Sequence, residues 1–370
     1  MMNIRFKKRV VLSAVLLSAT ITLACSTPVF RYAIERWEAD PYRLVVFSNG
    51  TLTEDQQQVV AGFRVYETSG YRSSPLIVDE YDISATNRLA AAVRAGLPTN
   101  RAAPCVALLY PEFMRMDTVV WSDDLTTNAL NRMIMSPARL EIARRLLDGD
   151  AAVWVFIPGG DAERNRAIHE MLNAKLRELE TTVQYNEDFL ALAKAAGKEP
   201  PKLKFSVLEL RRDNRQEAPL LAMLTQVSSS IATNSGPIVV PVFGQGRAAV
   251  LMMDEYVAGP YIEKVVQFLT GACSCEVKSQ NPGFDILIPV DWVGGIKQEY
   301  VFDAELPPLK SPSAEMGTLL SATNGATGTA GKTEHRLFGA VLSVFIVVVL
   351  GGLGGATWVL LRKKRNHESS

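Results

Sequence analysis

Residues 237–246 read Pro-Ile-Val-Val-Pro-Val-Phe-Gly-Gln-Gly, and this stretch decides the fold. Its apolar run, residues 238–243, has the length and the β-branched composition of a buried strand. The Gly-Gln-Gly that follows predicts a tight turn. Residues 247–253 then return as the next strand, and residues 261–269 predict a closing helix. The stretch therefore predicts the end of an α/β unit, in which a proline precedes a strand hairpin and a helix.

The residues before this stretch predict the start of the same unit. A buried-looking strand is followed by the turn Pro158-Gly159-Gly160, and Asp161 is placed to cap a long helix. The remaining elements alternate between strand and helix. In chain order the expected elements are strand 152–157, a helix reaching about residue 180, strand 205–210 and helix 219–227. Residues 286–290 predict one more strand at the edge of this half.

The first half of the chain predicts the same order, β-α-β-α-β-β-α. Ser136 and Pro137 mark the start of its last helix as cap and first helical residue, and Gly149 marks its end. The expected strands are 44–47, 76–81, 106–110 and 118–121, and the expected helices are 53–65, 87–95 and 136–147.

This order resembles the thioredoxin fold. Members of that family have a proline, usually in the cis form, just before the third strand, and Pro104 and Pro237 both stand there. The resemblance implies an α/β protein with two thioredoxin-like βαβαββα modules in tandem, and it rests on element order over residues 42–271. The alternatives are another α/β sandwich or a single larger doubly wound sheet.

The chemistry that this family usually carries is missing. Redox-active members have Cys-x-x-Cys between the first strand and the first helix, where the helix dipole helps to lower the pKa of the attacking thiol. The corresponding positions, residues 48–52 and 158–161, contain no cysteine. The chain also lacks the common hydrolase and zinc-protease motifs. We therefore expect a protein that is not an enzyme and needs no cofactor.

Three of the four cysteines lie in the expected folded region. Cys105 follows Pro104 and is interpreted as a small buried thiol. Cys273 and Cys275 are one residue apart. They could form a structural disulfide, with one of them linked to Cys105, a strained redox-active disulfide, or a two-thiolate site for Cu(I) or Zn, or remain inert thiols. A thiol-redox or soft-metal-handling role for Cys273 and Cys275 is therefore the alternative function.

Three polar sequences have both a binding interpretation and a plain one. Residues 159–161 could bind an anion at a helix start, or form only a turn and a helix cap. The acidic pairs at residues 123–124 and 254–255 could bind a cation, or lie in solvated turns. In each case the plain interpretation is favoured.

The N-terminus resembles a bacterial lipoprotein signal. A basic segment precedes fifteen uncharged residues, 10–24, which are too few to span a bilayer but suit a signal peptide. The resemblance implies that Cys25 is lipidated and becomes the mature N-terminus, although Thr22 stands where the pattern usually has leucine. The alternatives are an uncleaved signal anchor and an ordinary cleaved signal peptide. The aromatic residues within 28–37 could lie at the membrane interface or pack against the domain as a first helix.

The C-terminus predicts a transmembrane helix. Residues 337–361 contain no charged side chain and are long enough to span a bilayer, and four basic residues follow at once. Basic flanks mark the cytoplasmic side, so the tail is expected to be cytoplasmic and the main domains extracytoplasmic. Gly351 and Gly355 could form a helix–helix contact, in a homodimer or with a partner, or reflect ordinary glycine usage in such helices.

The sequence therefore predicts a binding or scaffolding protein of the bacterial envelope, anchored to the cytoplasmic membrane and without catalytic activity. Its expected partners are the membrane and another envelope membrane protein. Lysine plus arginine and aspartate plus glutamate both number 39, and this balance argues against nucleic acid as a partner. The expected parts are a signal or lipid anchor (1–25), the first module (26–150), the second module (151–309), a flexible linker (310–336), the transmembrane helix (337–361) and a basic tail (362–370).

Overall fold

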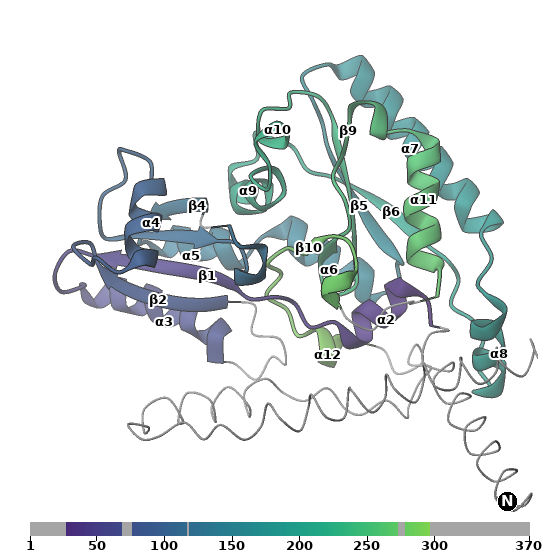
Figure 1. Cartoon of the computed structure of the whole chain (residues 1–370), viewed down its shortest axis with the longest axis horizontal. Helices are drawn as coiled ribbons and strands as arrows, with labels where there is room; N and C mark the ends of the chain where they lie inside the picture. The colour runs from purple at the N-terminus through teal and green to yellow at the C-terminus, as the bar shows by residue number, and fades with distance from the viewer. Residues whose placement is uncertain (1–26, 69–75, 117, 273–277, 297–370) are drawn as a thin grey trace, which may run out of the picture. The chain divides into compact units, whose positions relative to one another are not determined.

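The computed structural model describes residues 27–68, 76–116, 118–272 and 278–296, and in them the chain forms two β-sheets with helices packed against them (Figure 1). The mixed α/β class is confirmed. The anchors, the linker, Cys25, Cys273 and Cys275 lie outside the described residues, as do Gly351 and Gly355. Within the described part, no helix combines the length and the apolar character needed to cross a membrane.

The first sheet has the strand order β2-β1-β3-β4. β1 pairs with β2 in parallel, whereas β3 pairs antiparallel with both β1 and β4. Its elements are β1 (Tyr42–Ser48), α3 (Glu54–Thr68), β2 (Leu76–Asp82), α4 (Arg88–Gly96), β3 (Cys105–Leu109), the 3-10 turn η2 (Glu112–Met114) and β4 (Val119–Asp124).

The second sheet repeats this arrangement in the order β6-β5-β7-β8-β10, with β9 also paired to β7. β5 and β6 are parallel, and β7 is antiparallel to β5 and β8. Two sheets with the same order and directions are consistent with tandem thioredoxin-like modules. Its strands are β5 (Ala152–Ile157), β6 (Phe205–Glu209), β7 (Ile238–Phe243), β8 (Arg247–Ala248), β9 (Met252–Met253) and β10 (Phe284–Asp285).

Two expectations about the strands after β7 are corrected. The return strand expected at 247–253 is split into β8 and β9, because Pro241 in β7 has no N–H to donate to an uninterrupted ladder. The strand expected at 286–290 is placed earlier, at β10. The apolar residues Ile286, Leu287 and Ile288 are buried but lie outside any strand.

Further helices complete the described part. Two helices of eight or nine residues were not expected from the sequence, α5 (Thr127–Ile134) and α8 (Glu187–Ala195), although Thr126 and Asn186 cap them through their side chains. The remaining elements are α2 (Val29–Arg36), α6 (Pro137–Leu147), α7 (Ala162–Thr182), η3 (Arg215–Glu217), α9 (Ala218–Thr225), α10 (Ser229–Ala232), η4 (Asp254–Tyr256), α11 (Gly259–Thr270), η5 (Lys278–Gln280) and α12 (Trp292–Gly295). The four-residue helices α10 and α12 were not expected either.

α6 follows the strands of the first sheet in the sequence but packs on the second sheet. Ser136 caps α6 by accepting from the N–H of Arg139, as predicted, but α6 packs mainly against β5 and β6 of the second sheet. The helix that follows β4 and packs in the first module, against α3, is α5.

α2 precedes the first module but packs against the second, on β7 and α11 (Figure 1). Its Val29 N–H donates to the carbonyl of Gly271 over 3.1 Å. Because Phe30 and Trp37 are buried in the core cluster of the second sheet, residues 28–37 form a first helix of the domain and not a membrane-interface segment. From residue 28 to residue 157 the described chain therefore passes from the second module through the first and back to the second.

Side chains cover the edge of each sheet where the parallel strand lies. In the first sheet, the Glu67 carboxylate at the end of α3 accepts from the Val78 N–H of β2. In the second sheet, Glu180 near the end of α7 accepts from the Phe205 N–H of β6, and Arg145 donates to the Val207 carbonyl. These bonds occupy outward backbone groups that an edge strand otherwise leaves unpaired.

Candidate functional site

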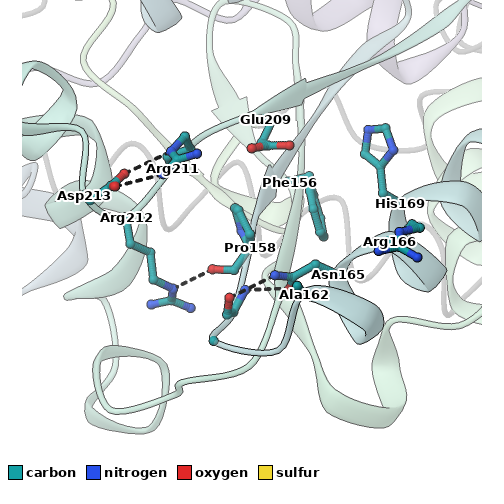
Figure 2. A pocket seen from close by; sticks show the side chains of 12 residues that line it. Phe156, Pro158, Ala162, Asn165, Arg166, His169, Glu209, Arg211, Arg212 and Asp213 are labelled. Atoms are coloured by element: carbon teal, nitrogen blue, oxygen red, sulfur yellow. Dashed lines mark hydrogen bonds and ion pairs between the residues drawn. The ribbon is translucent and has the colours of Figure 1, made fainter.

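A cavity of about 590 Å³ lies at the carboxyl ends of the parallel strands β5 and β6 (Figure 2). Its walls come from the β5–α7 turn, the first turns of α7, and the loop between β6 and η3. The volume is within the range of ligand sites, and open α/β sheets bind ligands at this edge. This is also the place where the thioredoxin resemblance puts catalytic cysteines, so we take it as the candidate site.

The β5–α7 turn is closed by its own polar groups. The Asn165 side-chain amide bonds both ways with the backbone of Gly159, with its Oδ1 2.8 Å from the Gly159 nitrogen and its Nδ2 2.9 Å from the Gly159 oxygen. The Gly160 N–H donates to the Ser235 carbonyl. Asp161 accepts from the N–H groups of Glu163 and Arg164. Because these N–H groups already have partners, the plain interpretation of residues 159–161 as a turn and helix cap is confirmed.

Gly159 is required by close backbone packing. A Cβ at this position would lie 2.7 Å from the Gly236 carbonyl carbon and the Ser235 oxygen. The turn therefore rests directly on the segment that leads into Pro237 and β7.

The two prolines that precede the third strands differ in their peptide bonds. The Ala103–Pro104 bond is cis, whereas the bond before Pro237 is not, so the expectation of a second cis proline is wrong. Trans is the more stable form of most X-Pro bonds. The carbonyl of Gly236, the residue before Pro237, also accepts a hydrogen bond from Arg212 Nη2 over 2.8 Å.

One wall of the cavity carries two adjacent arginines. Arg212 donates from Nε to the Pro158 carbonyl over 2.9 Å as well as to Gly236. Both acceptors are neutral, and desolvation by partial burial lowers the pKa of Arg212 from its usual value. Arg211 forms a two-point ion pair with Asp213, at 2.9 and 3.1 Å. Its hydrogen bond to Asp213 raises the pKa of Arg211, and the same bond lowers the pKa of Asp213.

The opposite wall is α7, which contributes Arg166 and His169. Figure 2 shows these two residues on the other side of Phe156 from Arg211 and Glu209. The His169 ring packs against Phe156, with 5.5 Å between ring centroids. Arg166 is exposed, and it has no ion pair or hydrogen bond within the described part of the chain.

The cavity offers guanidinium groups for binding acids, and its lining residues include no cysteine, serine or threonine to act as a nucleophile. Across the described ranges, no group of three or more histidine, cysteine or acidic side chains is placed to hold a metal ion. The arrangement can bind carboxylates through its guanidinium groups.

The other residues considered from the sequence lie elsewhere. Asp123 and Asp124 form ion pairs with Arg101, and Asp123 also pairs with Arg132, so residues 123–124 are engaged by cations of the protein itself. Asp254 accepts from Asn234 and lies 3.7 Å from Arg164.

Cys105 is a free thiol that is fully buried, and desolvation raises its pKa. It matches the interpretation as a small buried residue, whereas Cys273 and Cys275 lie outside the described residues.

The comparisons with known proteins are sparse. No protein-family model matches the chain, and neither does any curated protein. Among solved structures, the chain is similar to human ERp44 in its zinc-bound form, with 10% sequence identity and a TM-score of 0.20. The match covers 65% of this chain and 59% of that one, so this chain spans less than two thirds of the length of ERp44. The fold assignment accordingly rests on the strand order and directions described above.

Arg166, Arg211 and Arg212 were not predicted as site residues from the sequence. One signal was available, because Arg211 and Arg212 follow directly after the expected strand 205–210. The rule that ligands bind beyond the carboxyl ends of parallel strands points to such residues.

Proposed function

We propose that this chain is a non-catalytic binding protein that recognises its partner at the carboxyl ends of β5 and β6. The observation that carries the proposal is the composition of this edge. Where the thioredoxin resemblance places two thiols, the chain has a glycine turn closed by Asn165 and Asp161, flanked by three arginines. The site therefore has the position of a thioredoxin active site but carries guanidinium groups in place of thiols.

Site-specific photo-crosslinking in cells tests this proposal. A photoreactive residue in place of Arg166 is expected to give discrete adducts with another protein, because Arg166 is exposed in the cavity wall. The matched control is the same replacement at Arg177, which is exposed on α7 but does not line the cavity. Adducts that are equally abundant at both positions, or present only at Arg177, would contradict a partner site in the cavity.

A reductase assay tests the non-catalytic part of the same proposal. The purified chain is expected not to accelerate reduction of insulin by dithiothreitol. Acceleration that is lost in the double variant Cys273→Ser, Cys275→Ser would instead support the thiol-redox alternative. Cys105→Ser serves as the control, because this thiol is buried.

We further propose, from the sequence, that the protein is held at the bacterial cytoplasmic membrane. Its anchors are a lipid on Cys25 and the span at residues 337–361, with the two modules outside and the tail at 362–370 inside. The partner is then another membrane protein of the envelope. Two such anchors make attachment effectively permanent.

Metabolic labelling with a radioactive fatty acid tests the N-terminal anchor. The wild-type chain is expected to take up label, and Cys25→Ser is expected to lose it, since the thiol is the attachment point. Cys105→Ser should keep the label. Equal labelling of Cys25→Ser and the wild type would show that Cys25 is not lipidated.

A further inference from the structure

We propose that the cavity at the carboxyl ends of β5 and β6, here called the arginine cleft after Arg166, Arg211 and Arg212, binds an acidic segment of the partner polypeptide. This inference rests on the proposed function and names the chemistry that the site recognises. The bound segment would place aspartate or glutamate side chains between the two walls of the cleft.

The charge of the arginine cleft favours an acidic ligand. Of the three arginines, Arg166 has no carboxylate partner in the described part, and Arg212 is bonded to two neutral carbonyls. Arg211 has Asp213 as its neighbour, but this ion pair is largely exposed, with side chains 67% and 72% accessible. Exposed ion pairs contribute little free energy, so a ligand carboxylate can replace Asp213 at small cost. Guanidinium groups bind carboxylates through two parallel N–H···O bonds.

The open shape of the arginine cleft favours an extended ligand over a small one. Small ligands are usually bound in pockets that bury most of their surface. Here the charged side chains of both walls, Arg166 on one and Glu209, Arg211 and Arg212 on the other, are exposed residues. The walls face each other across Phe156 (Figure 2). An open cleft with cations on two sides suits several carboxylates along one chain better than a single small anion.

The covered edge of β6 disfavours a common mode of peptide binding. Peptides often bind a sheet by adding a strand to its edge. β6 is the edge strand beside the cleft, but Glu180 already accepts from its Phe205 N–H, and Arg145 already donates to its Val207 carbonyl. Recognition at this edge therefore depends on the side chains of the arginine cleft.

Fluorescence anisotropy with a fluorescein-labelled hexaglutamate peptide tests the inference on the purified full-length chain in a non-ionic detergent. Hexaglutamate is expected to bind, hexaglutamine is not, and the affinity should fall as salt is added because the cations are exposed. The double variant Arg166→Gln, Arg211→Gln should lose roughly five- to thirtyfold in affinity. Arg177→Gln, which removes one positive charge from α7 outside the cleft, should bind like the wild type, and Arg166→Gln alone is its single-charge counterpart inside the cleft.

Two further variants should change binding in the opposite direction. Glu209→Gln removes a carboxylate from the cleft wall, and Asp213→Asn releases Arg211 from its ion pair. Both are expected to strengthen binding of hexaglutamate several-fold, since they remove a repelling or competing negative charge. A gain in affinity cannot result from misfolding, so these variants separate recognition from stability.

The possible outcomes distinguish this inference from the proposed function. Failure of hexaglutamate to bind, or equal losses in Arg177→Gln and the cleft variant, would overturn the acidic-segment inference, while cleft-specific crosslinking from Arg166 would still stand. Competition by free succinate at the same carboxylate concentration would also overturn it, because the site would then take a small dicarboxylate. Absence of cleft-specific crosslinking would instead overturn the proposed function itself.

Discussion

Replacing Asp285 with alanine is expected to lower the free energy of unfolding by about 3–5 kcal/mol, the cost of removing one partner from a buried ion pair. Asp285 pairs with Arg247 at 3.1 Å, and the two side chains are only 3% and 4% accessible. The same carboxylate bonds Lys278 and accepts from the backbone N–H of Asp40 over 2.7 Å. Without it, Arg247 remains a buried cation with no carboxylate beside it among the described residues.

The position of Asp285 in the fold makes this loss global. Its contacts join β10 and β8 to the segment that enters β1, where the Tyr42 hydroxyl donates to the Asp285 carbonyl over 2.9 Å. Lys278 extends the link through a 2.7 Å ion pair with Asp40. The network therefore holds the entry to the first module against the sheet of the second.

Urea-induced unfolding followed by tryptophan fluorescence measures the effect, since Trp37 and Trp154 are buried. Glu178→Ala is the control, because its ion pair with Lys175 is exposed and should contribute less than about 1 kcal/mol. The double variant Arg247→Gln, Asp285→Ala should lose less than the two single changes combined. A loss for Asp285→Ala no larger than that of the control would show that the network does not stabilise the fold.

Replacing Arg139 with methionine is expected to cost about 2–4 kcal/mol, even though methionine keeps much of the buried volume. The Arg139 guanidinium is fully buried and donates to the main-chain carbonyls of Arg132, Met133 and Leu287. Desolvation lowers its pKa to about 10, so the group is still charged at neutral pH. Its loss leaves carbonyls at the end of α5 without a donor and removes the cation near the buried Glu217.

The matched control for this change is Arg144→Met on the same helix, because the Arg144 side chain is 59% accessible. Thermal unfolding should show a clearly lower melting temperature for Arg139→Met and little change for Arg144→Met. Equal melting temperatures for the two variants would mean that the Arg139 hydrogen bonds are not needed to join α5 and α6 to residue 287.

The central strands were predictable from the sequence because both of their faces are covered. β5 and β7 are buried at every position and match the predicted ranges 152–157 and 238–243. A strand covered on both faces is a continuous apolar run bounded by turn residues, which is a clear local signal. α6 was equally clear, because Ser136 and Pro137 mark its first turn.

The assignment of helices to sheets was not predictable in the same way. The pattern of α6 gives an apolar face but does not say which sheet that face covers, and α2 packs on a module that begins more than a hundred residues later. α5 is a different case, because Thr126 caps it and Ala129, Met133 and Ile134 form its buried face. That signal was present in the sequence, in a helix of only eight residues.

The candidate site depends on a contact between distant parts of the sequence. Arg166 lies in α7, and Arg211 and Arg212 follow β6; these segments share one cleft only because β5 and β6 pair in parallel. The absence of thiols at residues 158–161 was visible from the sequence, whereas the charge that takes their place requires the strand pairing. A missing residue type at a given position can thus be predicted from the sequence alone, whereas a site formed by distant segments can be predicted only once the strand pairing is known.

The shielded edges of β2 and β6 have a consequence for crowding. A protein confined to a membrane surface meets copies of itself far more often than one free in solution. Exposed strand edges can pair with the edges of other copies and so lead to aggregation. Glu67, Glu180 and Arg145 occupy outward backbone groups at these two edges from within the same chain. On the proposed membrane anchoring, these bonds would hinder the pairing of neighbouring copies through the edges of β2 and β6.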